Sequence, residues 1–357
     1  VGGSSPSGGT IYTDLYYPVG YNRRRGSFGQ FRRGCLGASE SFRLRVNGAG
    51  ARPTRCHGAY SSSAMAAALE GDERRGRGAN LGSVGTWVIL TFALLGMCIL
   101  PLFVLHVDLN NLKSGTSPPV LAIVGVLLSA YTPSLAAIMV TAVWKPRLGV
   151  RRLLAQMLRW RVHPGWYVLV LAGPIVLFLL ADALHIARGG AAPHDWVLLP
   201  DSGSLSFVFG GLIAGALGEE FGWRGFGQSR LQLRYGALVA AIFIGIVWST
   251  WHLWPAIVPG GHMAWSDVVA TYVRLISTAV IYAWIYNSTN NTLLVVMLAH
   301  IGHNIASALV QIPTDGSQDI PLIVALLYLT AAIVVVLLTR SRTLTRTKPE
   351  AATSAPG

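Results

Sequence analysis

Three short polar segments interrupt the apolar part of this sequence and hold most of the groups that could do chemistry. They contain, in chain order, Glu219, Glu220, Arg224, His252, His300 and Asn304. Ionisable groups at membrane depth are costly, so such residues are candidates for a functional site. We interpret the three segments as parts of one intramembrane catalytic site.

These residue types fit the hydrolysis of a peptide bond. A carboxylate in an apolar site can act as a general base toward water, with a histidine nearby to share the proton. A second histidine and an asparagine can donate hydrogen bonds to an oxyanion. Alternatively, Glu219, His252 and His300 could supply three ligands to a divalent metal such as zinc, which leaves a position open for water. Neither H-E-x-x-H nor G-x-S-x-G occurs, so the sequence gives no support for a zincin or a serine hydrolase.

Helical spacing predicts which of these groups share a face. Glu220 and Arg224 are four residues apart and can pair on one face, whereas the adjacent Glu219 points elsewhere. His300 and Asn304 have the same spacing, and an aromatic residue lies four positions before His252. Each later segment therefore offers two groups on one helical face.

The composition predicts a membrane protein. Of the 357 residues, 52% are hydrophobic and 12% are charged, which is far from an ordinary soluble domain. The net charge of +13 is concentrated in the N-terminal region and in short segments between apolar runs. This pattern is typical of cytoplasmic membrane loops and does not favour a nucleic-acid partner. The three cysteines have no C-x-x-C spacing and favour neither a disulfide framework nor a thiolate metal site.

The hydrophobic pattern predicts an all-α, polytopic fold of about eight transmembrane helices, bundled in a conical arrangement around the site. Each apolar segment approaches the roughly 20 residues that a spanning helix needs. The expected spans are 84–106, 118–143, 165–187, 205–226, 236–255, 267–287, 291–311 and 320–339. Clusters of Lys and Arg precede the first span and follow the second, fourth and eighth, which predicts that both termini are cytoplasmic.

The depths of the polar residues within these spans agree. If the chain turns at Gly236, Glu219 lies 17 residues before the turn and His252 lies 16 residues after it. At about 1.5 Å per residue, both lie roughly 24 to 26 Å from that turn. His300 lies somewhat closer to the same side, so a convergent site is geometrically possible.

Both ends of the chain differ from the membrane domain, which we place at 83–340. Residues 1–82 are predicted to be a disordered or dispensable basic tail, and 341–357 a cytoplasmic tail. The first 64 residues are rich in Gly, Ser and Arg without periodicity, which is typical of disorder. Met65 opens a more plausible start than Val1.

The three motifs together resemble the CAAX-protease and bacteriocin-processing (CPBP, Abi) family of intramembrane proteases. The resemblance covers roughly 205–309 and implies a hydrolase that cleaves a membrane-associated or lipidated protein or peptide. By this resemblance Glu219 would activate water with help from His252, and His300 and Asn304 would stabilise the oxyanion or complete a metal site. Glu220 and Arg224 would shape the pocket. Trp248 replaces the phenylalanine that is common in the family, and we expect this swap to keep an aromatic wall. Whether a metal takes part, and whether the substrate is prenylated, stay open.

Other interpretations remain for these residues and for the whole protein. Glu220 with Arg224 could be a buried structural ion pair, and Arg274 and Asp182 are expected to make structural ion pairs or water contacts. Spacing alone leaves the role of His303 open. A non-catalytic membrane scaffold or immunity protein of the same fold is one alternative function, and a secondary transporter is a weaker one.

Overall fold

The described part of the chain is almost entirely helical, which confirms the all-α fold class. The computed structural model describes residues 62–108, 119–144, 146–197, 215–310 and 319–345. Within these ranges the strand-like pairing is limited to an antiparallel bridge between Val197 and Val310. The helical elements are α1 (Ser62–Val104), α3 (Val120–Ser129), α4 (Thr132–Trp144), α5 (Pro146–Ala155), η1 (Gln156–Leu158), α6 (Pro164–Ala187), η2 (Phe221–Gln228), α8 (Ser229–Tyr235), α9 (Ala237–Trp251), α10 (Trp254–Ile257), α11 (Trp265–Ser288), α12 (Leu293–Leu309) and α13 (Asp319–Leu338).

Several helices are long and apolar enough to cross a membrane, as a polytopic protein requires. Among the described residues there are five such helices, or six if α3 and α4, which are bent by 65° relative to each other, form one span. The α12 helix is apolar but shorter, with 17 residues. The predicted span 205–226 begins outside the described residues. Helices therefore cover the described parts of all the predicted spans, although their number in the bilayer stays a prediction, as does the cytoplasmic placement of both termini.

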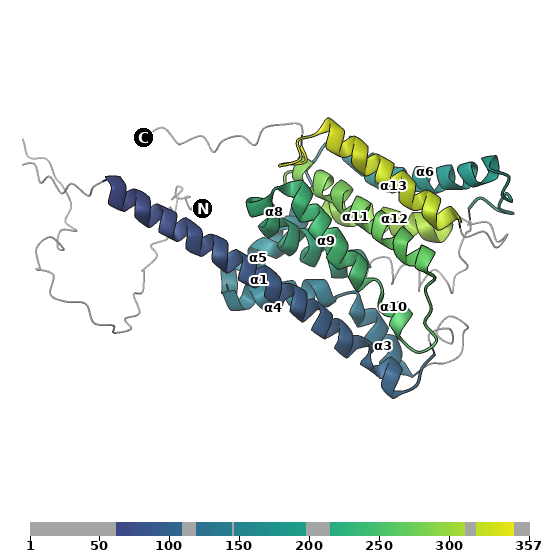
Figure 1. Ribbon diagram of the computed structural model, residues 1–357, viewed down its shortest axis with the longest axis horizontal. Helices are drawn as coiled ribbons and strands as arrows, with labels where there is room; N and C mark the ends of the chain where they lie inside the picture. Colours follow the sequence, from purple (N-terminus) through teal and green to yellow (C-terminus); the bar gives the residue numbers. More distant parts are fainter. Residues whose placement is uncertain (1–61, 109–118, 145, 198–214, 311–318, 346–357) are drawn as a thin grey trace, which may run out of the picture. The chain divides into compact units, whose positions relative to one another are not determined.

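The candidate site residues lie on helices that pack closely against their neighbours. The α11 helix packs against α9 and α13, and α12 packs against α6 (Figure 1). Large apolar side chains also cover outward faces, including Leu121, Val168 and Leu337. A surface of this kind suits contact with lipid tails, because the hydrocarbon core has no water for polar groups.

The turn between α8 and α9 lies at Gly236, where the sequence predicts it. Gly236 has φ of +82°, a conformation that glycine adopts without a steric penalty. The chain therefore reverses direction here, and α9 packs against both α8 and η2. This reversal brings the glutamates that precede η2 beside α9.

The ends of the predicted membrane domain differ in detail from the helices observed. The α1 helix begins at Ser62, so residues 62–82 of the predicted N-terminal tail, 1–82, are helical. Beyond α13, the backbone carbonyls of Ser341 and Arg342 accept hydrogen bonds from Leu238 and Ala237 at the start of α9. The rest of both predicted tails, 1–61 and 346–357, lies outside the described residues.

Candidate active site

The two glutamates lie where a helix changes its geometry. Residues 215–220 are α-helical and continue directly into η2, a π-helical stretch. Wider π-helical turns are rare and occur frequently at functional sites. The side chains of Glu219 and Glu220 are 4% and 0% exposed. Two adjacent carboxylates are therefore buried together in a region without an aqueous surround.

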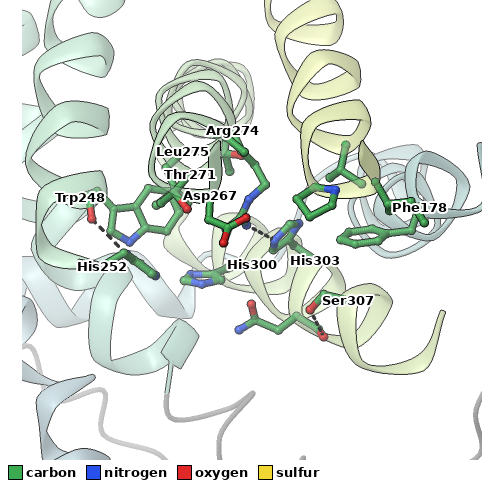
Figure 2. Close-up of a pocket in the computed structure, with 16 residues that line it drawn as sticks. Phe178, Trp248, His252, Asp267, Thr271, Arg274, Leu275, His300, His303 and Ser307 are labelled. Atoms are coloured by element: carbon green, nitrogen blue, oxygen red, sulfur yellow. Dashed lines mark hydrogen bonds between the residues drawn. The ribbon is translucent and has the colours of Figure 1, made fainter. Parts of the chain in front are cut away.

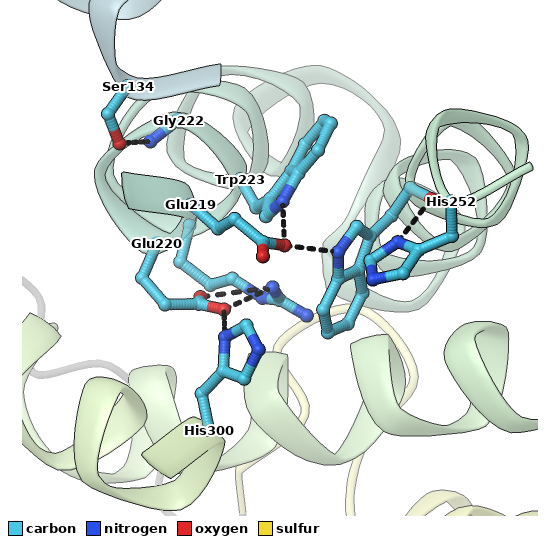
Figure 3. Close-up of polar contacts among 9 residues, drawn as sticks. Ser134, Glu219, Glu220, Gly222, Trp223, His252 and His300 are labelled. Atoms are coloured by element: carbon cyan, nitrogen blue, oxygen red, sulfur yellow. Dashed lines mark hydrogen bonds and ion pairs between the residues drawn. The ribbon is translucent and has the colours of Figure 1, made fainter. Parts of the chain in front are cut away.

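Glu219 is held by two tryptophans. Its Oε2 atom accepts hydrogen bonds from the indole Nε1 of Trp223, at 3.1 Å, and of Trp248, at 2.6 Å (Figure 3). Trp223 is four residues further along the same helix, and Trp248 comes from α9. The Oε1 atom of Glu219 has no hydrogen-bond partner among the described residues. One oxygen is thus fixed, and the other is free for chemistry.

Glu220 has partners on both oxygens. Nη1 of Arg224 donates to Oε1 at 2.9 Å and to Oε2 at 3.0 Å. Nδ1 of His300, on α12, lies 2.9 Å from Oε1 (Figure 3). Because a carboxylate only accepts, Nδ1 of His300 carries the proton and its Nε2 is left for another contact. The predicted ion pair between Glu220 and Arg224 is present, and it joins the first motif to the third.

Arg224 is enclosed by aromatic rings. Its guanidinium lies 4.6 Å from the ring centroid of Trp248 and 4.8 Å from that of Tyr282. Its Nε and Nη2 atoms are buried without a hydrogen-bond partner among the described residues, so these rings supply the remaining contacts through cation–π interactions. With both carboxylates ionised and His300 neutral, the cluster of Glu219, Glu220 and Arg224 has a net charge of −1.

His252 lies at the C-terminal end of α9 (Figure 3), and its ring is 5.6 Å from that of Trp248, measured between the ring centroids. Its Nδ1 is 3.0 Å from the backbone carbonyl oxygen of Trp248. A carbonyl only accepts, so Nδ1 donates and Nε2 keeps a lone pair. No hydrogen bond joins His252 to Glu219 in the described part of the chain. Trp248 connects the two through its indole and its backbone.

Gly215 marks a small space between Glu219 and Asn304. A Cβ atom built on Gly215 would lie 3.4 Å from Nδ2 of Asn304 and 3.7 Å from Oε1 of Glu219. The Asn304 side-chain amide makes no hydrogen bond to any described residue. The free carboxylate oxygen and the free amide therefore border the space that the absent side chain leaves.

Gly218 and Gly222 serve packing instead. A Cβ on Gly218 would lie 2.4 Å from the carbonyl oxygen of Ala130, and one on Gly222 would lie 2.5 Å from backbone atoms of Pro133. The glutamate helix can approach the start of α4 this closely because these positions have no side chain. Gly218 and Gly222 thus allow close packing, whereas Gly215 leaves room beside the carboxylates.

A cavity of about 380 Å³ adjoins the cluster. His252, His300 and Asn304 line it, together with Trp248 (Figure 2). Histidines and an asparagine from two of the three motifs thus face one space that is large enough for part of a peptide.

Comparison with known proteins agrees with this arrangement. Residues 201–306 match the family described as Type II CAAX prenyl endopeptidase Rce1-like. The similarity to this family covers these residues, about a third of the chain. A similar protein is CAAX prenyl protease 2 of Methanococcus maripaludis, which is 38% identical over 91 residues. The alignment covers 24% of this chain and 32% of that relative, so the similarity spans about a third of the relative's length.

The Rce1-like region, residues 201–306, contains all six predicted site residues, and the family resemblance drawn from the motifs is confirmed. The structure brings Glu219, Glu220, Arg224 and His300 into one hydrogen-bonded cluster with Trp248. Asn304 borders the space beside Glu219, and His252 faces the adjoining cavity. Their individual roles stay predictions.

The Rce1-like region does not form the predicted three-ligand metal set. Glu219 gives one oxygen to two indoles, His300 bonds Glu220, and His252 bonds a backbone carbonyl. Within the described ranges, no three His, Cys, Asp or Glu side chains are grouped in a way that could hold a metal ion. The residues as arranged therefore do not fit a zinc site.

Sequence reasoning missed several aromatic partners. Trp223 and Tyr282 were not expected at the site, although the spacing of four residues between Glu219 and Trp223 was a usable signal. Trp248 was expected to form only an aromatic wall, yet its indole N–H is a hydrogen-bond donor to Glu219. A phenylalanine at this position could not make that bond.

The structure also shows the contacts of three further polar residues within the predicted spans: Arg274, Asp182 and His303. Arg274 contacts Nε2 of His303 at 2.8 Å and makes no ion pair with any described carboxylate. Of its two expected contacts, an ion pair is therefore not present among the described residues, and a water contact stays a prediction. Asp182 is 1% exposed, and its Oδ2 has no hydrogen-bond partner among the described residues. Both Arg274 and His303 line the cavity.

Proposed function

We propose that this protein is an intramembrane endopeptidase that cleaves a prenylated, membrane-associated protein or peptide within the bilayer. The family match over residues 201–306 and the CAAX prenyl protease 2 of M. maripaludis support this activity and this substrate class. The long apolar helices support a membrane location.

One observation carries the mechanism: the two oxygens of Glu219 have different surroundings. Oε2 is anchored by the indoles of Trp223 and Trp248, whereas Oε1 borders the space at Gly215. A water molecule in that space would lie within reach of Oε1. We assign Glu219 as the general base that removes a proton from this water.

The charge of the cluster favours that step. Glu219, Glu220 and Arg224 together have a net charge of −1 inside a buried, apolar region, and an uncompensated buried charge is costly. When Glu219 takes the proton from water, the cluster becomes neutral while the negative charge moves to the attacked carbonyl oxygen. The base therefore becomes protonated without leaving a new unpaired charge among its neighbours.

Donors for the developing oxyanion come from α12. The Asn304 amide borders the same space as Oε1 of Glu219, and we assign it as an oxyanion donor. His300 is oriented by Glu220 and lines the cavity, with its second ring nitrogen left for another contact. His252 also lines the cavity, and its Nε2 lone pair can first accept a proton and then pass it to the leaving amine.

No step in this proposal runs through a metal ion, because no three described His, Cys, Asp or Glu side chains are grouped so that they could hold one. Zinc would require the free oxygen of Glu219 and the free ring nitrogens of His252 and His300 to converge on one point. A chelator tests this part separately from peptide cleavage itself.

The test is cleavage of a library of prenylated peptides by the purified full-length protein in detergent or vesicles. We expect wild type to release products, Glu219→Gln to release none above background, and a chelator to change little. Asp195→Asn, which alters an exposed carboxylate, is the control and should cleave like wild type.

Other results would point elsewhere. Cleavage that a chelator abolishes and zinc restores would overturn the metal-free water while keeping the protease. Equal cleavage by wild type and Glu219→Gln would remove Glu219 as the base. Absence of cleavage by wild type, under conditions where a known family member is active, would favour the scaffold or transporter alternatives.

A further inference from the structure

We propose that Arg274 binds the C-terminal carboxylate of the peptide substrate and thereby selects substrates that end close to the cleaved bond. This inference rests on the proposed peptidase function. Arg274 comes from the middle of α11 and lines the cavity that also contains His252, His300 and Asn304 (Figure 2). The cationic group therefore faces the same space as the two histidines and the asparagine of the candidate site.

Arg274 has a positive charge without a matching carboxylate. No described carboxylate lies within ion-pair distance of its guanidinium. Asp267, seven residues earlier on α11, lines the same cavity but makes no ion pair with it. A cation at membrane depth is costly and normally pairs or faces a functional cavity. The cavity at Arg274 thus has the charge and the hydrogen-bond donors that suit an anionic group.

Two aromatic residues fix the orientation of Arg274. Nη1 of Arg274 lies 2.8 Å from Nε2 of His303, and Nδ1 of His303 lies 2.7 Å from the Tyr328 hydroxyl. Since arginine only donates, Nε2 of His303 must accept, and its proton therefore sits on Nδ1, which donates to Tyr328. His303 is neutral in this arrangement, and Arg274 is held through one nitrogen.

The remaining donors of Arg274 can recognise a carboxylate. A guanidinium has five N–H groups in a planar fork, and the contact with His303 uses one nitrogen. The fork matches the two oxygens of a carboxylate, which gives both strength and direction. His303 and Tyr328 are thus positioning residues that act through Arg274, which answers the open question about His303.

The separation between His300 and the proposed anion site at Arg274 matches the length of a few residues at the end of a peptide. His300 and His303 are three residues apart, so their Cβ atoms are about 5 to 6 Å from each other. With the further contact to Arg274, the anion site lies roughly 8 to 12 Å beyond His300, which corresponds to about two to four residues of extended chain. A peptide held by its C-terminal carboxylate at Arg274 would place a bond near its end beside His300, which is hydrogen-bonded to Glu220, the neighbour of Glu219.

The experiment compares two peptides that differ only at the last group, a free carboxylate or a carboxamide. For wild type we expect kcat/KM to be about 10 to 100 times higher for the free acid, mostly through KM, which is the effect of hydrogen bonds to a charged group. Arg274→Gln should lower cleavage of the acid to the level of the amide and leave cleavage of the amide within about threefold. Arg188→Gln, at the exposed end of α6, is the matched arginine control and should keep the preference.

Binding without turnover gives a second measurement. In a Glu219→Gln background, the Kd of the acid peptide should be about 10 to 100 times lower than that of the amide, and adding Arg274→Gln should remove this difference. Tyr328→Phe should reduce the preference by about threefold, because it removes one hydrogen bond that orients His303. Arg274→Lys, which keeps the charge without the fork, should retain part of the preference.

The outcomes separate this inference from the proposed function. If wild type cleaves and binds neither peptide, the proposed function fails. If wild type treats acid and amide equally, the role of Arg274 fails while the protease stands. If Arg274→Gln folds like wild type in thermal unfolding but loses both peptides equally, Arg274 supports the structure rather than the specificity. If Arg274→Gln does not fold, Arg274→Lys and Tyr328→Phe decide, and an unchanged preference in both overturns the proposal.

Discussion

Glu219 and Glu220 are neighbours of the same residue type, yet their surroundings differ in almost every respect. Glu219 has two neutral donors on one oxygen and none on the other. Glu220 has a guanidinium on both oxygens and a histidine on one. The first arrangement leaves an atom free to react, whereas the second satisfies every oxygen and ties α12 to the glutamate helix.

Helix geometry explains how two adjacent residues reach such different environments. Consecutive residues on a helix point roughly 100° apart. Glu219 therefore meets the indole of Trp248 on α9, and Glu220 meets His300 on α12. The comparison teaches that a pair of buried carboxylates need not form a catalytic pair: one can do the chemistry while the other holds the elements that surround it.

The largest expected effect tests whether Glu219 is the residue that does the chemistry. Glu219→Gln should lower kcat by about 10² to 10⁴, the usual contribution of a general base. Stability should change little, because the glutamine side chain has the same shape and its carbonyl oxygen can still accept from Trp223 and Trp248. Steady-state kinetics and thermal unfolding of the same preparation check both parts. A large drop in unfolding temperature would assign Glu219 a structural role instead.

Glu220→Gln tests whether Glu220 stabilises the fold through its ion pair with Arg224. It removes the carboxylate that pairs directly with the buried Arg224 guanidinium, so the free energy of unfolding should fall by about 3 to 5 kcal/mol. The double variant Glu220→Gln/Arg224→Met removes both charges and should recover most of that loss. Thermal unfolding in detergent measures both. A stable single variant with unchanged activity would show that the pair holds nothing together.

Trp223 and Trp248 both donate to Oε2 of Glu219, so replacing each one in turn measures what holding this oxygen contributes. Trp248→Phe removes the 2.6 Å hydrogen bond to Glu219 and should destabilise the protein by about 1.5 to 3 kcal/mol, as expected for a bond to a charged group. Activity should stay within about tenfold, since a phenyl ring can still contact Arg224 and the His300 ring, which lies 5.5 Å from that of Trp248. Trp223→Phe removes the longer 3.1 Å bond and should cost less. A size-exclusion assay of thermal aggregation avoids the altered tryptophan fluorescence, and equal effects of the two variants would contradict the ranking.

Much of the fold could be predicted because lipid imposes simple rules on sequence. Apolar runs of spanning length located the helices, and the reversal at Gly236 placed the first two motifs at a common depth. The bend of 65° between α3 and α4 could not be predicted, because the apolar pattern continues through it. The change to π-helical geometry after Glu220 left no mark that spacing rules detect.

The sequence predicted which residues lie close together more than how they contact one another. Spacing paired Glu220 with Arg224 and separated Glu219 from them, as observed. It could not show that His300 bonds Glu220 rather than joining Glu219 and His252, because that depends on how α12 is rotated against the glutamate helix. Arg274 appeared as an isolated charge in a span, and its contact with His303 exists only because α11 and α12 pack side by side.

The smallest expected effect concerns the space beside the free oxygen of Glu219. Gly215→Ala places a methyl group 3.4 Å from Asn304 and 3.7 Å from Glu219, which are ordinary contacts, and alanine favours a helix over glycine by about 1 kcal/mol. Stability should therefore hold or rise slightly, while kcat falls about tenfold because the methyl group occupies the position assigned to water. Gly218→Ala is the matched control: its methyl group would lie 2.4 Å from a backbone carbonyl oxygen, so it should lose about 1 to 3 kcal/mol of stability through overpacking. If Gly215→Ala keeps full activity, the attacking water does not lie between Glu219 and Asn304, and the general base would have to act from its other side.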